Sequence, residues 1–156
     1  MSEKAFQDYY PDDVSYCYGC GRLNDDGYHF QTRWDGEETV TVFEPGPQHI
    51  AIPGYVYGGL LASLIDCHST GTAAAAAYRA EGRPMDSDPP FRFVTASLRV
   101  DYLKPTPLGV PLTVRGVVKE VKGRKVVVSS ELSAEGVVCV RGEVVCVEMP
   151  EHLVPE

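Results

Sequence analysis

Two ionisable side chains interrupt an apolar stretch of the chain and are the first candidates for chemistry. The range 60–78 contains no lysine, arginine or glutamate, yet it carries Asp66 and His68. Burying a carboxylate costs several kcal/mol unless the group is paired or is kept for chemistry. Asp66 is therefore either a functional group or half of an ion pair with an arginine, such as Arg79 or Arg99, across a dimer.

A glycine pair, Gly58-Gly59, stands just before this stretch. The first N–H groups of a helix lack intrahelical acceptors and lie at the positive end of its dipole. Glycine also lets a carbonyl group approach the backbone closely. The N–H of Gly59, together with that of Leu60, is thus a candidate donor to a developing oxyanion. The alternative is that the pair merely permits a tight turn into the helix.

Helical spacing relates these groups to one another. Asp66 follows Gly59 by seven residues, which places it on the same helix face roughly 10 Å further along. That separation suits a carboxylate that reaches a substrate held in the partner subunit's half of a site. His68 lies roughly 200° around the helix from Asp66, so we expect a hydrogen-bonded core or interface histidine. His49 precedes the helix, and we expect it to orient the loop or a water molecule.

Cys17 and Cys20 form a C-x-x-C pair in the segment CYGCG. A structural zinc ion usually has four protein ligands, commonly from two such pairs. The sequence shows no second pair, so His29 or a symmetry-related pair would have to complete the site. The expected interpretation is a tight turn with small buried thiols, without a metal ion or a redox role.

The elements that must position these groups can be read from apolar periodicity and turn residues. Strands are expected over 28–34 and 39–44, and one buried helix of about 20 residues follows the glycine pair. A loop of about ten residues, rich in proline, should follow the helix. Further strands are expected over 91–104, 112–121, 124–134 and 137–148, within a single domain of residues 1–156 that has an irregular lead-in (1–27) and a tail (150–156).

This order predicts an α+β domain with an antiparallel sheet of about six strands, the last four forming a meander. One helix cannot cover both faces of such a sheet. We therefore expect the sheet to wrap around the helix and to leave an edge or a face for a partner subunit. A homodimer is expected, possibly a dimer of dimers.

Composition indicates which binding partners and which cellular location are expected. A net charge of -8 argues against general nucleic-acid binding and against an anionic membrane surface. The segment MSEKAFQDYY has no apolar core, so no secretory signal is expected. Five irregularly spaced cysteines do not suggest a disulfide framework, and a cytoplasmic location is expected.

Three motifs in order resemble those of the hotdog-fold acyl-CoA thioesterases, in the branch of the phenylacetyl-CoA and mammalian THEM-type enzymes. The first is H-x-x-x-P-G-x-x-Y-G-G over 49–59, where Tyr57 replaces the histidine usual in the family. The second runs from Gly58-Gly59 to the sequence L-I-D that ends at Asp66. The third is T-A-S-L-R-V-D-Y-L-K-P over 95–105, and CYGCG resembles a C-F-G-C-G lead-in. Together they cover about residues 17–107.

The resemblance implies a thioesterase of fatty acid metabolism that hydrolyses an acyl-CoA to a carboxylic acid and CoA. Asp66 would be the general base or the nucleophile, Gly59 would donate to the oxyanion, and Thr95 would help to position the attacking water. No cofactor is expected beyond the CoA of the substrate. Residues expected to bind the substrate are His49, Tyr57, Gly58, Leu60, Lys104 and Arg124.

Two of these assignments have alternatives within the sequence. Strict alternation along 94–102 places Thr95 on the polar face of its strand, so either that face borders a dimer cleft or a bulge intervenes. Lys104 and Arg124, with Lys122 and Lys125, are candidates for the CoA phosphates. Charged hairpin tips are equally common for solubility.

Two other functions compete with hydrolysis. Hotdog hydratases and dehydratases usually carry a D-x-N-P-x-H loop, which this sequence lacks. A non-catalytic acyl-CoA-binding domain remains the second hypothesis, and Asp66 with Gly58-Gly59 argues against it. An apolar pocket is suggested by Tyr55, Tyr57, Met85 and Phe91, and these residues do not specify the acyl chain.

Overall fold

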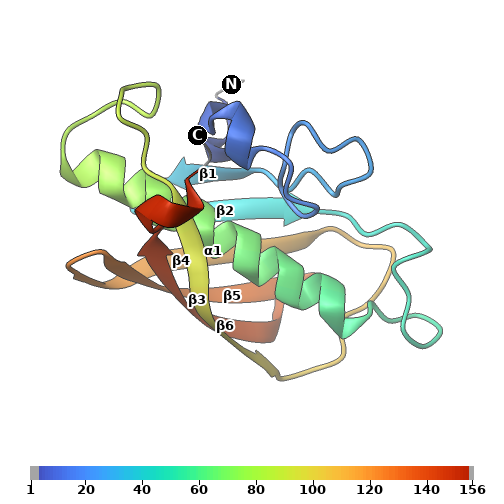
Figure 1. The fold of residues 1–156 in the computed structure, drawn as a ribbon. Helices are drawn as coiled ribbons and strands as arrows, with labels where there is room; N and C mark the ends of the chain where they lie inside the picture. Colours follow the sequence, from blue (N-terminus) through green and yellow to red (C-terminus); the bar gives the residue numbers. More distant parts are fainter. Residues whose placement is uncertain (1–3, 155–156) are drawn as a thin grey trace.

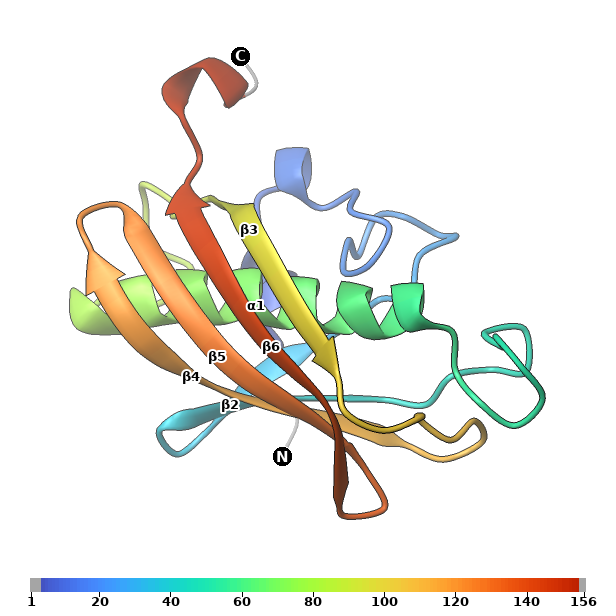
Figure 2. The same ribbon diagram turned by 90° about the horizontal axis from the view of Figure 1, so that it is seen from below.

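The computed structural model describes residues 4–154 of the 156-residue chain. One long helix, α1 (Gly58–Ala80), lies across a six-stranded antiparallel sheet that curves around it (Figures 1 and 2). The expected α+β architecture is confirmed. The strands are β1 (Thr32–Asp35), β2 (Glu38–Phe43), β3 (Phe93–Tyr102), β4 (Leu112–Lys122), β5 (Lys125–Ala134) and β6 (Val137–Glu148).

Most of the surface of α1 is buried, which explains why its sequence is apolar nearly all round. Its first half supplies Leu60, Leu64 and Ile65, which are fully buried. These side chains pack in one core with valines that point inward from the sheet, such as Val114 and Val144. In the described part of the chain, no helix combines the length and apolarity that a membrane crossing requires.

The strand order differs from the predicted meander of four strands. The sheet runs β1-β2-β4-β5-β6-β3, so of the four strands after the helix only β4, β5 and β6 are neighbours in the order of the chain. β3, which follows the helix, pairs with β6 at the edge of the sheet (Figure 2). β2 pairs with β4 instead, so that β1 and β3 form the two edges. The loop after α1 thus carries the chain to the outer side of β6.

β3 contains a bulge at Ala96. Thr95 is opposite Cys146 and Ser97 is opposite Val145, so the residue between them has no partner in the ladder. The extra residue shifts the alternation of the strand. Thr95 therefore faces the helix, together with Leu98 further along the strand, where strict alternation had placed Thr95 on the opposite face.

Two segments are less regular than the sequence suggested. The first expected strand, 28–34, is shorter: β1 begins at Thr32, and His29 has a positive φ of 58° that is incompatible with a strand. The lead-in forms two short 3-10 helices, η1 (Phe6–Tyr9) and η2 (Asp12–Val14). Within the expected tail, Glu151–Leu153 forms a further 3-10 turn, η3, while residues 1–3 and 155–156 of the two expected terminal segments lie outside the described part.

Candidate active site

The carboxylate of Asp66 lies near the middle of α1 at the wall of a cavity of about 270 Å³. It is half-buried, and burial raises the pKa of Asp66 above its usual value of 3.8 because the charged form is desolvated. A hydrogen bond from Thr95 acts in the opposite direction and lowers this pKa. The carboxylate is thus held in a partly apolar setting without a cationic partner among the causes of its shift.

Thr95 is brought to Asp66 by the bulge in β3. Its Oγ1 donates a hydrogen bond to Asp66 Oδ1 at 2.5 Å. The arginines that the sequence offered as ion-pair partners are engaged elsewhere within the chain. Arg79 stacks on Trp34 and donates to a backbone carbonyl, while Arg99 pairs with an exposed aspartate of its own strand.

The cavity beside Asp66 is mostly apolar. Its walls come from the 3-10 segments, the cysteine loop, the middle of α1 and the beginning of β3. Phe91 is the one member of the suggested apolar pocket that lines it; Tyr57 and Met85 line two other hollows. The further apolar lining residues are Tyr10, Val14, Ala74, Phe93, Val94 and Met149.

The start of α1 offers free backbone donors. Gly58 is the first helical residue, and Tyr57 precedes it in an extended conformation without a side-chain capping hydrogen bond. The first turn contains no acidic side chain, so the positive end of the helix dipole is not neutralised there. Gly59 is exposed at this end, whereas Leu60 is fully buried, backbone included. Within one chain, Gly59 and not Leu60 is therefore the residue of this pair that a ligand can reach.

His49 and Tyr57 line a second hollow, of about 680 Å³, beside the start of the helix. His49 Nδ1 accepts a hydrogen bond from the Gly46 N–H at 2.9 Å, which fixes the loop before the helix. The hydroxyl groups of Tyr57 and Tyr28 share a hydrogen bond of 2.9 Å. Within one chain this hollow is separate from the cavity that contains Asp66.

His68 is a satisfied core histidine, in agreement with the sequence prediction. Its ring is fully buried, and its two nitrogens bond the hydroxyl groups of Thr41, at 2.7 Å, and Thr39, at 3.0 Å. Burial lowers the pKa of His68 from 6.5 to about 3 because the charged ring would be desolvated. It has no contact with the Asp66 cavity.

Lys104 and Arg124 do not meet within one chain. Lys104 follows β3 at the end where β6 begins, and its N–H bonds the Cys139 carbonyl. Arg124 stands at the other end of β6, where Glu148 holds its guanidinium at 3.2 Å. A ten-residue strand separates these ends by about 30 Å.

Two contacts near the site were not anticipated from the sequence. The hydroxyl of Tyr102 donates to the Gly58 carbonyl at 2.8 Å and joins the end of β3 to the start of α1. Cys67, next to Asp66 on the helix, lies beside Cys17 and Cys20. Helical position alone gave no signal for this contact, because it depends on where the cysteine loop folds back.

Comparisons with known proteins agree on one family. A family model described as "Thioesterase superfamily" matches residues 53–145. Acyl-coenzyme A thioesterase THEM4 of Xenopus laevis is 38% identical over 93 residues, which are 60% of this chain and 36% of that protein. The chain thus matches little more than a third of the length of this curated relative.

Solved structures extend the likeness over most of the chain. A thioesterase superfamily protein from Shewanella loihica PV-4 is 48% identical, with a TM-score of 0.68, and the match covers 90% of this chain and all of that one. A hypothetical thioesterase protein from Streptococcus pneumoniae TIGR4, solved with coenzyme A, is 16% identical with a TM-score of 0.63. That match covers 77% of this chain and 88% of the other, and it shows a shared fold only.

Proposed function

The chain belongs to the thioesterase superfamily, and from that premise we propose that it hydrolyses an acyl-CoA thioester to a carboxylic acid and coenzyme A. The observation that carries this proposal is the Asp66 carboxylate, held by Thr95 at the wall of a largely apolar cavity. Two observations support this class of substrate: the THEM4 relative is named an acyl-coenzyme A thioesterase, and the streptococcal protein was solved with coenzyme A.

Asp66 acts as the general base in this proposal. Its raised pKa makes it a better proton acceptor than an exposed carboxylate. It takes a proton from a water molecule as the water oxygen attacks the thioester carbon. Thr95 holds one carboxylate oxygen, which leaves the other to face the water. The tetrahedral intermediate then expels the CoA sulfur as the leaving group.

The Gly59 N–H is assigned to the oxyanion. It lies about 10 Å along the helix from Asp66, too far for both groups to act on one carbonyl within one chain. A dimer resolves this distance if the start of α1 from one subunit lies beside Asp66 of the other. The long edge strand β3 supports such pairing, because within the described part of the chain it has a neighbour on one side only, and it exposes Leu98 and Tyr102.

The apolar cavity is assigned to the acyl group. Its aromatic and aliphatic walls, including Phe91 and Phe93, adjoin the carboxylate that must meet the thioester. A volume of about 270 Å³ lies near the lower limit of typical ligand pockets. Short or compact acyl groups therefore fit this cavity better than long chains do.

The test is hydrolysis of a panel of acyl-CoAs, from short to long chain and including phenylacetyl-CoA, followed by release of free thiol. Asp66→Asn should lower kcat by several hundredfold with the fold intact, in line with the loss of a general base. Asp101→Asn is the matched control, because Asp101 is exposed on β3 and pairs with Arg99. Equal losses in both variants would contradict the assignment of Asp66. Absence of turnover, with acyl-CoA still raising the Tm, would indicate a binding domain instead.

A further inference from the structure

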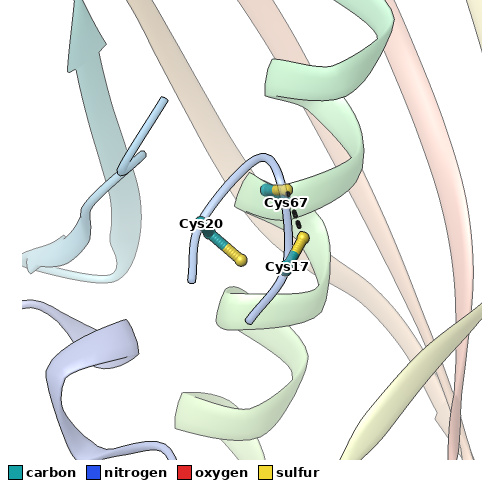
Figure 3. A group of neighbouring side chains, drawn as sticks. All are labelled: Cys17, Cys20 and Cys67. Atoms are coloured by element: carbon teal, nitrogen blue, oxygen red, sulfur yellow. Dashed lines mark hydrogen bonds between the residues drawn. The ribbon is translucent and has the colours of Figure 1, made fainter. Parts of the chain in front are cut away.

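Three cysteine thiols meet beside the Asp66 cavity, although two distant parts of the chain supply them. Cys17 and Cys20 come from the loop after η2, and Cys67 comes from the middle of α1 (Figure 3). Their sulfur atoms all lie within 4.8 Å of one another, and Cys17 Sγ is 3.9 Å from Cys67 Sγ. All three thiols are free, and all three line the cavity.

The spacing of these sulfur atoms fits one tetrahedral metal ion. With zinc–sulfur bonds of about 2.3 Å, tetrahedral thiolates lie about 3.8 Å apart. The distance between Cys17 and Cys67 already has this value, within about 0.1 Å. A metal ion could therefore bind after small side-chain movements. The sequence analysis predicted no metal ion because it found a single cysteine pair. The fold adds a third thiol, that of Cys67 in α1.

The loop is shaped to lie directly on the helix thiol. At Gly19 a side chain would overlap Cys67 Sγ, so only glycine lets the loop reach this position. The loop is closed by a hydrogen bond of 2.8 Å from the Gly21 N–H to the Cys17 carbonyl. Gly19 thus lets Cys17 and Cys20 lie close to the thiol of Cys67.

Metal binding would place three thiolates within 4.8 Å of one another. Three thiolates cannot coexist here without a positive charge between them. The one cationic side chain among the described residues that line the cavity is Arg92, and it pairs with Asp13.

We propose that Cys17, Cys20 and Cys67 bind a single Zn²⁺ ion through three thiolates, with the fourth coordination position facing the cavity that also holds Asp66. The fourth ligand is then water or another small donor in the cavity. Binding displaces the thiol protons to solvent and involves no change of oxidation state. The proposal does not depend on thioester hydrolysis, because none of the three ligands is assigned a role in that reaction.

Metal binding is tested on the whole chain, purified without metal and kept reduced and free of oxygen. Zn²⁺ is titrated in competition with a chromophoric chelator, and Co²⁺ is used as a spectroscopic substitute. The expected result is one ion per chain. Co²⁺ should give the intense thiolate charge-transfer absorption and the visible bands of a tetrahedral site. Zn²⁺ should also raise the Tm, because it binds the folded state.

Cysteine variants distinguish this site from adventitious binding. Cys17→Ser and Cys67→Ser should abolish stoichiometric binding and the thiolate absorption. Cys139→Ser is the matched control, because Cys139 is a buried free cysteine outside the cluster, and it should bind Zn²⁺ like the unmodified chain. Cys17 is exposed, so its variant should fold even if Cys67→Ser does not.

Three results would overturn the proposal. The first is that the unmodified, reduced chain has the same affinity for Zn²⁺ as the Cys17→Ser variant. The second is that the Co²⁺ complex lacks thiolate absorption, which would place the ion on other ligands. The third is that stoichiometric binding persists when Cys17 and Cys67 are both replaced by serine.

Discussion

Thr95 Oγ1 donates a hydrogen bond of 2.5 Å to Asp66 Oδ1, and this bond joins the edge strand β3 to the middle of α1. Two effects on the same carboxylate are opposed here. Burial raises the pKa of Asp66, and the threonine hydroxyl lowers it by stabilising the charged form. The threonine therefore extends to lower pH the range in which the proposed base is ionised.

The acid limb of the pH profile should depend on this hydroxyl. Because the base must be ionised, kcat/KM should fall as the pH drops through the pKa of Asp66. Thr95→Val removes the donor and raises this pKa, so the fall should begin at higher pH, whereas Thr95→Ser keeps the donor and the profile. The rates are measured with a chelator present, so that no cation beside Cys67 contributes. An acid limb common to all three proteins would contradict the role of Thr95.

The oxyanion assignment can be tested by removing a single N–H. Proline is tolerated in the first turn of a helix and lacks this group. Gly59→Pro should therefore lower kcat by about 10²–10³-fold, the usual cost of one oxyanion donor. Gly59→Ala adds a side chain at the same place and keeps the N–H, so it reports any clash with the Tyr57 ring. Equal losses in the two variants would assign the effect to that clash.

Subunit complementation should reveal a shared site. Asp66→Asn and Gly59→Pro are each expected to be poorly active as homodimers. A mixture that exchanges subunits should regain part of the activity, because one site of each heterodimer then combines an intact Asp66 with an intact Gly59. The measurement is turnover before and after subunit exchange, with each variant alone as a control. No recovery, with heterodimers demonstrated, would place both groups in one subunit.

His68 should make the protein sensitive to acid. The folded state holds the ring neutral with a pKa of about 3, whereas the ordinary value is 6.5. The unfolded chain therefore takes up a proton as the pH falls below 6.5, and this part of the stability is lost progressively towards pH 3. The slope should approach about 1.4 kcal/mol per pH unit. Urea unfolding of His68→Gln should show a shallower decline between about pH 6 and pH 4, and parallel declines would contradict the prediction.

Close approach of the helix to the sheet should make Gly142 intolerant of a side chain. In Gly142→Ala the new Cβ would overlap Cγ2 of Ile65. Over-packing of this kind costs about 1–3 kcal/mol of stability. Ile65→Leu removes the branched methyl group, so the double variant should lose less stability than the sum of the two single variants. The measurement is a double-mutant cycle of urea unfolding, and strict additivity would contradict the contact.

Most elements of the fold could be predicted from the sequence, because each follows from a local pattern. The apolar run between Gly58-Gly59 and Gly82 predicted α1 almost to its ends, and the turn at Lys122-Gly123 separated two valine-rich strands. The resemblance to thioesterases of the THEM type is confirmed by the comparisons. These features depend on the periodicity of apolar residues and on the positions of turn residues, both of which can be read from a single sequence.

What the sequence did not predict depends on distant contacts. Strand order reflects which sheet edge accepts β3 after the helix, and no local pattern records that choice. Alternation has a period of two and does not indicate where an extra residue such as Ala96 is inserted. The face of Thr95 therefore depends on the register between β3 and β6. Cys67 likewise joined the cysteine pair only through tertiary folding.

The position of β3 outside β6 has a consequence for folding. The strand that carries Thr95 is made soon after the helix, but among residues 4–154 its only neighbour in the sheet is β6, the last strand described. During synthesis β3 stays unpaired until β6 has been made. Such non-local pairing is slow and leaves strand edges exposed. Contact between Thr95 and Asp66 therefore becomes a late event of folding, and a chain that ends before β6 forms neither the sheet edge nor the site.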